Sequence, residues 1–203
     1  FGKDSTLLLL ASLEAHKQLI EEGIIAQDAP FVVSTIDTGV ENHLMQMLVH
    51  EEVSRLTTYC EAQSINLKVH FATPPLSRTW ASLFLSGHKM LSTARLNNDC
   101  SVILKINSSE RIEKAIAALY GDVCILVGSR IDESVRRAQN LQKRNQASRD
   151  VLDFLEGLND KREDNVFAPI SHITTDQVWL LLRRAGTNPI KTPSSKQVQV
   201  PSY

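Results

Sequence analysis

Short apolar runs rich in β-branched residues alternate along this chain with longer segments of helical periodicity. The spacing predicts strands at 31–36, 67–72, 123–127 and 167–170, and helices at 4–26, 43–63, 108–120, 146–158 and 174–185. Strands that alternate with helices pair in parallel, because the chain crosses one face of the sheet between them. We therefore expect an α/β fold over residues 1–185, an open and mostly parallel sheet flanked by helices. An irregular tail is expected over 186–203.

Composition narrows the class of protein further. A chain of 203 residues suits one domain, and its 22 Lys and Arg against 23 Asp and Glu leave a net charge of −1. Any binding to nucleic acid would therefore depend on a local basic patch. No apolar run approaches the roughly 18 residues of a membrane span. Three cysteines cannot all pair, and no secretory signal is recognisable, so we expect a cytoplasmic protein with no membrane partner.

The first polar cluster is Gly2-Lys3-Asp4-Ser5-Thr6, which leads directly into an apolar helical run. Glycine lets backbone N–H groups approach an anion, and the start of a helix carries a partial positive charge. Lys3 adds a full charge, so the cluster suits a phosphate or pyrophosphate, although its spacing is not that of a Walker A loop. The alternative is an ordinary helix start capped by Ser5 or Thr6. No strand precedes this turn, so we expect the numbering to begin inside a motif.

Two further clusters follow predicted strands, where ligands bind in parallel sheets. Asp37-Thr38-Gly39 precedes Glu41 and Asn42, and an acidic residue at that place can hold Mg²⁺ or a ribose hydroxyl. We expect Asp4 and Asp37 to be the magnesium ligands. The alternative is a turn that caps the next helix.

The second of these clusters is Gly128-Ser129-Arg130, followed by Arg136 and Arg137. A guanidinium at a strand end can fork onto phosphate oxygens, and the two later arginines add cationic density. The alternative is a helix start with solvated ion pairs.

The cysteines differ in their surroundings. Cys100 lies in a polar stretch before Lys105, and a nearby cation lowers the pKa of a thiol and makes thiolate available. A buried structural role for Cys100 is the alternative. Cys124 lies within an apolar strand and Cys60 within a predicted helix, so both are predicted to pack in the interior.

The order of these clusters resembles the PP-loop ATP pyrophosphatases of the phosphoadenosine-phosphosulfate (PAPS) reductase type. Those families carry an S-[GF]-G-K-D-S loop, in which Phe1 corresponds to the second residue, and a late P-I-x-x-[WT]-x-x-D-V-W segment, which Pro169 to Trp179 matches. The resemblance implies a Rossmann-like fold of the adenine nucleotide alpha hydrolase type. From the residues alone, Thr174 caps a helix, and Val178 and Trp179 pack it onto the sheet.

A narrower set of residues is similar to the sulfur-transfer ATPases of DNA phosphorothioation, the DndC and SspD type. Those proteins have a P-P-L…W…G stretch that runs into R-W-C-T-x-x-L-K-I. Here Asn98 and Asp99 replace the Arg-Trp pair and Arg95 is displaced; the matching residues are Thr73-Pro74-Pro75-Leu76, Trp80, Gly87, Cys100 and Leu104-Lys105-Ile106. DndC-type relatives are associated with an iron–sulfur cluster, but three cysteines cannot supply four thiolates. The cluster-free SspD-like branch, or a fragment that has lost ligands, is therefore expected.

The resemblance implies a two-step reaction. The loop would hold ATP with Mg²⁺, a DNA phosphate oxygen would attack the α-phosphorus and expel pyrophosphate, and a persulfide sulfur would then displace AMP. Cys100 is the expected sulfur relay. The catalytic residues implied are Lys3, Asp4, Cys100 and Arg130. The implied ATP-binding residues are Gly2, Lys3, Asp4, Ser5, Thr6, Asp37, Thr38, Gly39, Lys105, Gly128, Arg130 and Arg136. The implied partners are a cysteine desulfurase, DNA and other phosphorothioation proteins, and a homo-oligomer is left open.

Three other functions are compatible with the same motifs. The first is a PAPS or adenosine-phosphosulfate reductase, although that family uses a cysteine near its C-terminus and none follows Cys124 here. The second is a tRNA-thiolating enzyme with the same adenylation chemistry. The third is a non-catalytic nucleotide-binding adaptor for a desulfurase.

Overall fold

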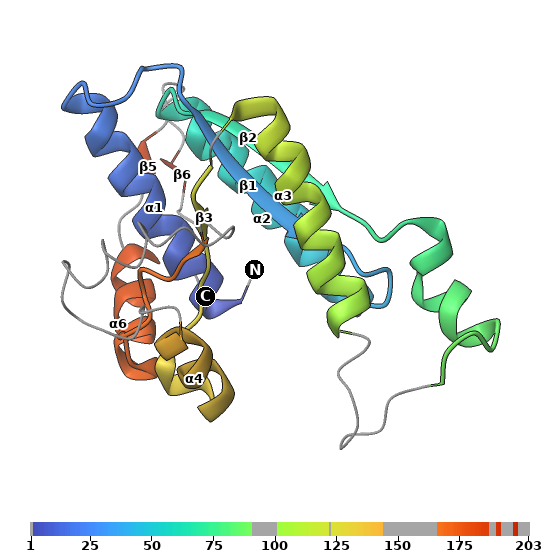
Figure 1. The fold of residues 1–203 in the computed structure, drawn as a ribbon. Helices are drawn as coiled ribbons and strands as arrows, with labels where there is room; N and C mark the ends of the chain where they lie inside the picture. The colour runs from blue at the N-terminus through green and yellow to red at the C-terminus, as the bar shows by residue number, and fades with distance from the viewer. Residues whose placement is uncertain are drawn as a thin grey trace. The chain divides into compact units, whose positions relative to one another are not determined.

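A computed structural model describes residues 2–90, 101–121, 123–143, 166–186, 190–191 and 197–198 (Figure 1). The chain forms two compact units. The first unit comprises residues 1–29, 54–65 and 123–203, and the second comprises residues 30–53 and 66–122. No helix in the described ranges has both the length and the apolar character that crossing a membrane requires.

The second unit is built on two parallel strands. β1 (Pro30–Ile36) and β2 (Asn66–Ala72) pair from Pro30 opposite Asn66 to Ile36 opposite Ala72. The connection between them contains α2 (His43–Ala62), as a parallel pair requires a crossover. Helix α3 (Asn107–Tyr120) lies against both strands (Figure 1). The described part of the chain between β2 and α3 contains the shorter helical turns η1 (Leu76–Arg78), η2 (Ala81–Leu85) and η3 (Ser101–Ile106).

The first unit packs helices around a small apolar core. Helices α1 (Lys3–Glu21) and α6 (Thr175–Gly186) contact each other. Their apolar faces bury Leu7 and Leu8 against Ile170, Val178 and Leu182. Among the described residues, this unit also contains β3 (Ile125–Leu126), η4 (Ile131–Glu133), α4 (Val135–Lys143), β4 (Val166–Phe167), β5 (Ile190–Lys191) and β6 (Gln197–Val198).

The strands of the first unit are short. β3 and β4 pair in parallel, and Val127 N–H extends the pairing with a hydrogen bond to Phe167 O at 2.8 Å. β5 and β6 form an antiparallel pair inside the segment that we expected to be irregular. The extent of a domain over 1–185 stays a prediction.

The α/β class and the parallel pairing are confirmed. One continuous open sheet is not present among the described residues, which hold three separate two-stranded pairs. The helices predicted at 4–26, 43–63, 108–120 and 174–185 are present within a few residues. Strand β1 is half-buried: it pairs with β2 along one edge, and no described strand pairs with its other edge. Helix α4 was not predicted, and the helix predicted at 146–158 lies outside the described residues.

Candidate nucleotide-binding site

Helix α1 begins without a side-chain cap. Gly2 is its N-cap, with extended backbone, and Gly2 O accepts the first helical hydrogen bond from Thr6 N–H at 2.9 Å. Ser5 is exposed inside the helix and Thr6 is buried inside it, so the capping alternative for these two residues is wrong. Because no side chain caps this end, the N–H groups of the first turn are directed to whatever occupies the space before the helix.

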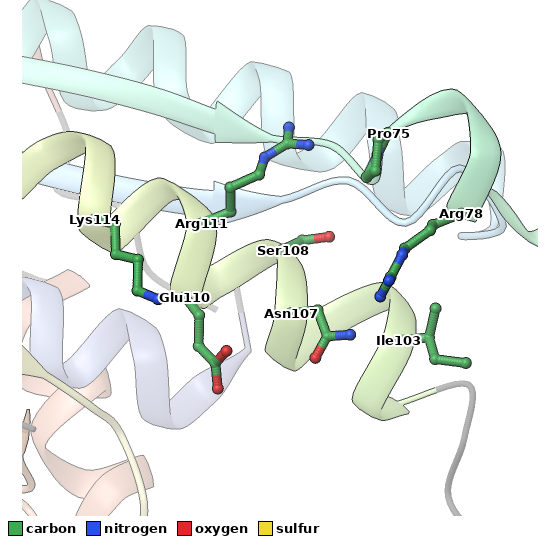
Figure 2. Close-up of a pocket in the computed structure, with 8 residues that line it drawn as sticks. All are labelled: Pro75, Arg78, Ile103, Asn107, Ser108, Glu110, Arg111 and Lys114. Carbon is green, nitrogen blue, oxygen red and sulfur yellow. The ribbon is translucent and has the colours of Figure 1, made fainter.

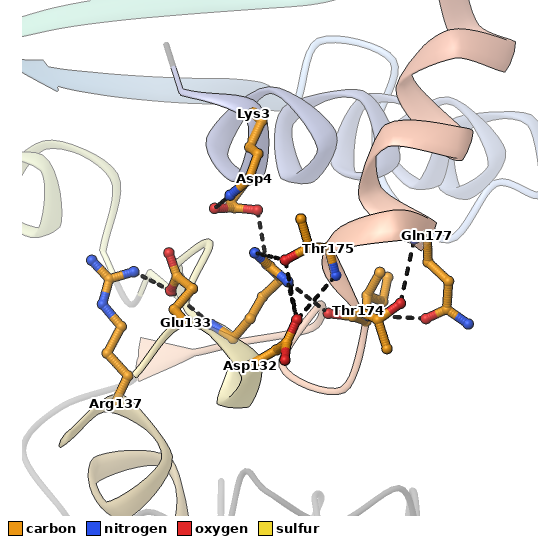
Figure 3. A network of polar contacts seen from close by, with 10 residues as sticks. Lys3, Asp4, Asp132, Glu133, Arg137, Thr174, Thr175 and Gln177 are labelled. Carbon is orange, nitrogen blue, oxygen red and sulfur yellow. Dashed lines mark hydrogen bonds and ion pairs between the residues drawn. The ribbon is translucent and has the colours of Figure 1, made fainter. Parts of the chain in front are cut away.

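Asp4, in the first turn of α1, is bonded to two cations (Figure 3). Lys3 Nζ donates to Asp4 Oδ2 at 2.7 Å, and Arg130 Nε donates to Asp4 Oδ1 at 2.8 Å. The Arg130 side chain is 1% exposed, whereas that of Lys3 is 28% exposed. The predicted loop residues Lys3 and Asp4 and the predicted strand-end residue Arg130 therefore meet in one cluster of the first unit.

The two cations set the charge state of Asp4. Partial burial of the carboxyl acts to raise its pKa, but hydrogen bonds from Lys3 and Arg130, and the charges of both, outweigh burial and lower the pKa below its usual value. Asp4 is therefore a carboxylate at neutral pH.

The other donors of Arg130 are also used within the protein. Arg130 Nη1 donates to Ile173 O at 3.1 Å and lies 3.6 Å from Asp132 Oδ2. Arg130 Nη2 donates to Thr175 Oγ1 at 3.2 Å. The fork that we predicted to bind phosphate thus faces protein oxygens in this structure, and its contact with a phosphate stays a prediction.

Asp132 and Thr175 form an outer layer around Arg130. Asp132 Oδ2 accepts hydrogen bonds from Thr175 N–H at 3.2 Å and from Thr175 Oγ1 at 3.1 Å, and these bonds lower the pKa of the Asp132 carboxyl. The sequence analysis gave neither residue a role. The available signal was weak: a carboxylate two positions after the strand-end arginine and a hydroxyl at the start of the late helix.

Helix α6 is held at its start by reciprocal capping. Thr174 N–H donates to Gln177 Oε1 at 2.9 Å, and Gln177 N–H donates to Thr174 Oγ1 at 3.3 Å, so the predicted capping role of Thr174 is confirmed. Val178 is buried as predicted, whereas Trp179 is about half exposed and does not pack inside. This capping fixes the start of α6, and with it the position of Thr175 beside Arg130.

Gly128 brings the turn after β3 against the first turn of α1. A Cβ atom at this position would lie 3.2 Å from Asp4 C, 3.3 Å from Asp4 O and 3.3 Å from Ser5 N. These atoms are all backbone, so a larger residue would push the turn away from α1. The glycine therefore permits the close approach that lets Arg130 reach Asp4.

The two arginines after Arg130 lie on α4. Arg137 Nη1 donates to Glu133 Oε2, and Glu133 Oε2 also accepts Arg130 N–H at 3.2 Å. This pair confirms the ion pairing at a helix start that we listed as the alternative for this cluster. Arg136 is exposed, and a contact with ATP stays a prediction for it.

Asp37, Thr38 and Gly39 form a turn after β1 in the second unit. Asp37 Oδ1 accepts Gly39 N–H at 2.9 Å, and Gly39 has φ of +72°, which favours glycine. Thr38 is buried and donates from Oγ1 to Glu41 Oε1 at 3.1 Å. Asn42 Oδ1 accepts Leu44 N–H at 2.9 Å at the start of α2, so this cluster has the capping role given as its alternative.

Lys105 also belongs to the second unit. Its Nζ lies 3.5 Å from Glu41 Oε1, in an exposed ion pair. Its predicted contact with ATP is not tested by this pairing, since an exposed pair of this kind contributes little and exchanges readily.

The structure confirms the predicted burial of one cysteine and contradicts that of another. Cys60 is buried as predicted, and burial raises the pKa of its thiol to about 11. Cys124 is exposed, so its predicted core position is wrong, because β3 spans only Ile125 and Leu126 and leaves the preceding residue outside the pairing. Cys100 lies outside the described residues.

The described residues contain no group of three or more His, Cys, Asp or Glu side chains that could hold a metal ion. Both carboxylate oxygens of Asp4 already accept hydrogen bonds from cations, and Asp37 Oδ1 accepts a backbone N–H. This arrangement does not by itself present a magnesium site at Asp4. Mg²⁺ often takes substrate phosphates and water as most of its ligands, so magnesium binding at Asp4 and Asp37 stays a prediction.

A glycine turn, an uncapped helix start and a lysine beside it are features of a phosphate-binding loop. The model of the phosphoadenosine phosphosulfate reductase domain family matches residues 1–191. The chain belongs to this family. Comparison with curated proteins and with solved structures found no match.

Proposed function

We propose that this protein is an ATP pyrophosphatase that adenylates a DNA backbone phosphate for sulfur transfer. The observation that supports the loop's role is the cluster at the start of α1, where Lys3 is partly exposed and Asp4 is held by buried Arg130. In this proposal Lys3 binds the outer phosphates of ATP together with the N–H groups of the first turn. Arg130 is a positioning residue, because it acts on the loop through Asp4.

The different roles of Lys3 and Arg130 follow from their exposure and from the charge of Asp4 between them. When a triphosphate enters, Lys3 can turn from Asp4 to the phosphate oxygens, since its Nζ is the exposed partner of the pair. Asp4 then keeps Arg130 as its counter-ion and stays in place. Positioning and neutralisation of the phosphates would supply most of the rate enhancement.

The proposed reaction consists of two displacements at phosphorus and one thiol exchange. A DNA phosphate oxygen forms a bond to the α-phosphorus of ATP as the bond to the β-phosphate oxygen breaks, and pyrophosphate leaves. The terminal sulfur of a cysteine persulfide then attacks the DNA phosphorus and expels AMP. A second thiol cleaves the resulting sulfur–sulfur bond, which leaves the phosphorothioate and a cysteine disulfide for a cellular dithiol to reduce. Cys100 is the proposed carrier of the persulfide, and a cysteine desulfurase is the proposed donor.

Release of pyrophosphate from ATP tests the loop. We expect Lys3→Ala to lower DNA-stimulated release at least a hundredfold, and Lys17→Ala, which removes a lysine from the same helix, to leave it within twofold. Release that survives Lys3→Ala, or a wild-type protein that does not release pyrophosphate, would contradict the proposal.

The sulfur step needs its own test. We expect Cys100→Ser to retain pyrophosphate release and to abolish phosphorothioate dinucleotides in host DNA, measured by mass spectrometry. Normal phosphorothioate levels in that variant would remove Cys100 from the proposed mechanism.

A PAPS or adenosine-phosphosulfate reductase is the second candidate, and the family match to the PAPS reductase domain favours it. In that reaction the same loop would bind the phosphates of a nucleotide sulfate. Release of sulfite from PAPS in the presence of a dithiol, with no pyrophosphate from ATP, would select this function over the first.

A further inference from the structure

A basic pocket lies in the second unit, which does not contain the Lys3 loop. Its volume is about 230 Å³, and the turn η1 and the segment from η3 into α3 supply its walls (Figure 2). The lining residues are Pro75, Arg78, Ile103, Asn107, Ser108, Glu110, Arg111 and Lys114. Pro75 belongs to the Thr73-Pro74-Pro75-Leu76 stretch of the predicted motif, to which the proposed reaction gives no role.

Ser108 is a buried polar residue in the lining of this pocket. It is 3% exposed, and its hydroxyl has no hydrogen-bond partner among the described residues. A buried hydroxyl in a helix can usually donate to the carbonyl four residues before it, and an unpaired one costs free energy. The Ser108 hydroxyl is therefore a donor that no described residue uses.

Two guanidinium groups lie on either side of that hydroxyl. Figure 2 shows Ser108 between Arg78 and Arg111, with Asn107 beside Arg78. Arg111 Nη2 donates to Thr73 O at 3.1 Å, which fixes the side chain while leaving other N–H donors of its fork. Lys114 adds a third cation and Glu110 one negative charge, so the lining carries a net positive charge.

We propose that this pocket binds one phosphate group of a nucleic-acid backbone. A phosphodiester carries acceptor oxygens that can take the Ser108 hydroxyl and the forks of Arg78 and Arg111 at once. The pocket is smaller than the roughly 300–1,000 Å³ of typical small-molecule sites, so it suits one phosphate whose attached sugars and bases lie outside. With a net charge of −1 over the whole chain, a local basic pocket of this kind is the place where a polyanion would bind.

This site can be tested apart from the ATP reaction, because none of its residues is among those proposed to contact ATP. The effect of substituting a pocket residue can therefore be distinguished from the effect of substituting Lys3. A protein could lack pyrophosphatase activity and still bind nucleic acid here.

Fluorescence anisotropy with a labelled single-stranded 12-mer oligonucleotide tests the assignment. Substitution of either arginine, as Arg78→Gln or Arg111→Gln, is expected to weaken binding by about tenfold or more, because each removes a charged hydrogen bond. The plot of log affinity against log salt should become shallower by about 0.7 for each charge removed. Ser108→Ala should weaken binding several-fold. Lys68→Gln removes an exposed charge elsewhere in the same unit and should change binding less than twofold.

Further measurements test whether the variant folds, which anion the pocket binds and whether binding is separate from pyrophosphate release. Arg78 is exposed, so Arg78→Gln should keep the wild-type circular dichroism spectrum and melting curve. Lys3→Ala should bind the oligonucleotide normally while losing pyrophosphate release. Equal weakening by Arg78→Gln and Lys68→Gln would overturn the pocket in favour of diffuse charge. Arg78-dependent binding of AMP or inorganic phosphate, without binding of the oligonucleotide, would overturn the nucleic-acid assignment.

Discussion

Arg130 Nε donates to Asp4 Oδ1 at 2.8 Å and so joins two residues that are 126 positions apart in the chain. Asp4 stands in the first turn of α1, and Arg130 follows the strand β3. Each was predicted from its local motif as a phosphate-site residue. Their contact holds Asp4 in place, and Lys3 is the more accessible of the two cations that contact Asp4.

Substitution of Arg130 should destabilise the protein strongly. Arg130→Met removes four polar contacts at a buried position and leaves the oxygens of Asp4, Ile173 and Thr175 without a donor. Loss of one partner of a buried ion pair costs about 3–5 kcal/mol, and we expect a loss near 3 kcal/mol because Asp4 keeps Lys3. Urea denaturation measures this change in the free energy of unfolding. Arg136→Met, at an exposed position of α4, should lie within about 0.5 kcal/mol of wild type.

The Asp4 carboxylate should make stability depend on pH in acid. Burial tends to raise its pKa, but Lys3 and Arg130 lower the pKa below the usual 3.8, so the folded protein binds this proton more weakly than the unfolded chain. The stabilisation is fully present above pH 3.8 and is lost as the pH falls through the lower folded value. Urea midpoints between pH 2.5 and 6 should show this loss in wild type, and Asp4→Asn should remove that part of the dependence. Asp176→Asn, at an exposed position, should lose stability at low pH as wild type does. The same loss in Asp4→Asn would contradict the role given to the Asp4 carboxylate.

Gly128→Ala should disturb the site by steric contact alone. The added Cβ meets the backbone of Asp4 and Ser5 at 3.2–3.3 Å, and neither can rotate away as a side chain would. We expect a loss of about 1–3 kcal/mol in unfolding free energy, the range of overpacked positions, together with weaker ATP binding measured by calorimetry. Gly2→Ala places its Cβ in open space, but alanine is a poorer helix N-cap than glycine, so this variant should lose less than about 1 kcal/mol. Equal losses in the two variants would show that the close approach at Gly128 is unimportant.

Native thiol labelling should distinguish the two cysteines that the structure describes. Burial raises the pKa of Cys60 to about 11, so almost no thiolate exists at pH 8, and the side chain is also inaccessible. Cys124 is exposed. Treatment with iodoacetamide at pH 8, followed by peptide mass spectrometry, should modify Cys124 while Cys60 reacts only after urea is added. Labelling of Cys60 at the rate of Cys124 in the native protein would contradict its burial.

Local patterns were enough to predict much of the fold. The helical periodicity of the apolar residues over 4–26 identified α1, and the β-branched run after Pro30 identified β1. The capping role of Thr174 was also predicted from residues within one turn, although its reciprocal bond with Gln177 was not. These features depend on neighbours a few positions away, so the sequence carries them directly.

The errors came from positions whose surroundings are distant in sequence. Cys124 and Trp179 were predicted to be buried, because apolar neighbours flank them, but the faces that contain them are exposed. Arg130 was predicted as a phosphate ligand because it follows a strand end; that contact stays a prediction, but its burial was not predicted. Its near-complete burial depends on α1 and α6 meeting beside it, which no local window of sequence contains.

Most of the helices and strands, and their order, follow from local sequence, because backbone preference and helix polarity act over a few residues. The bonds of Arg130 to Asp4 and Thr175, the bond of Thr175 to Asp132, and the lack of a partner for the Ser108 hydroxyl among the described residues depend on tertiary packing. Contacts of this kind depend on which helices and turns pack together, and burial then strengthens each polar interaction by excluding water.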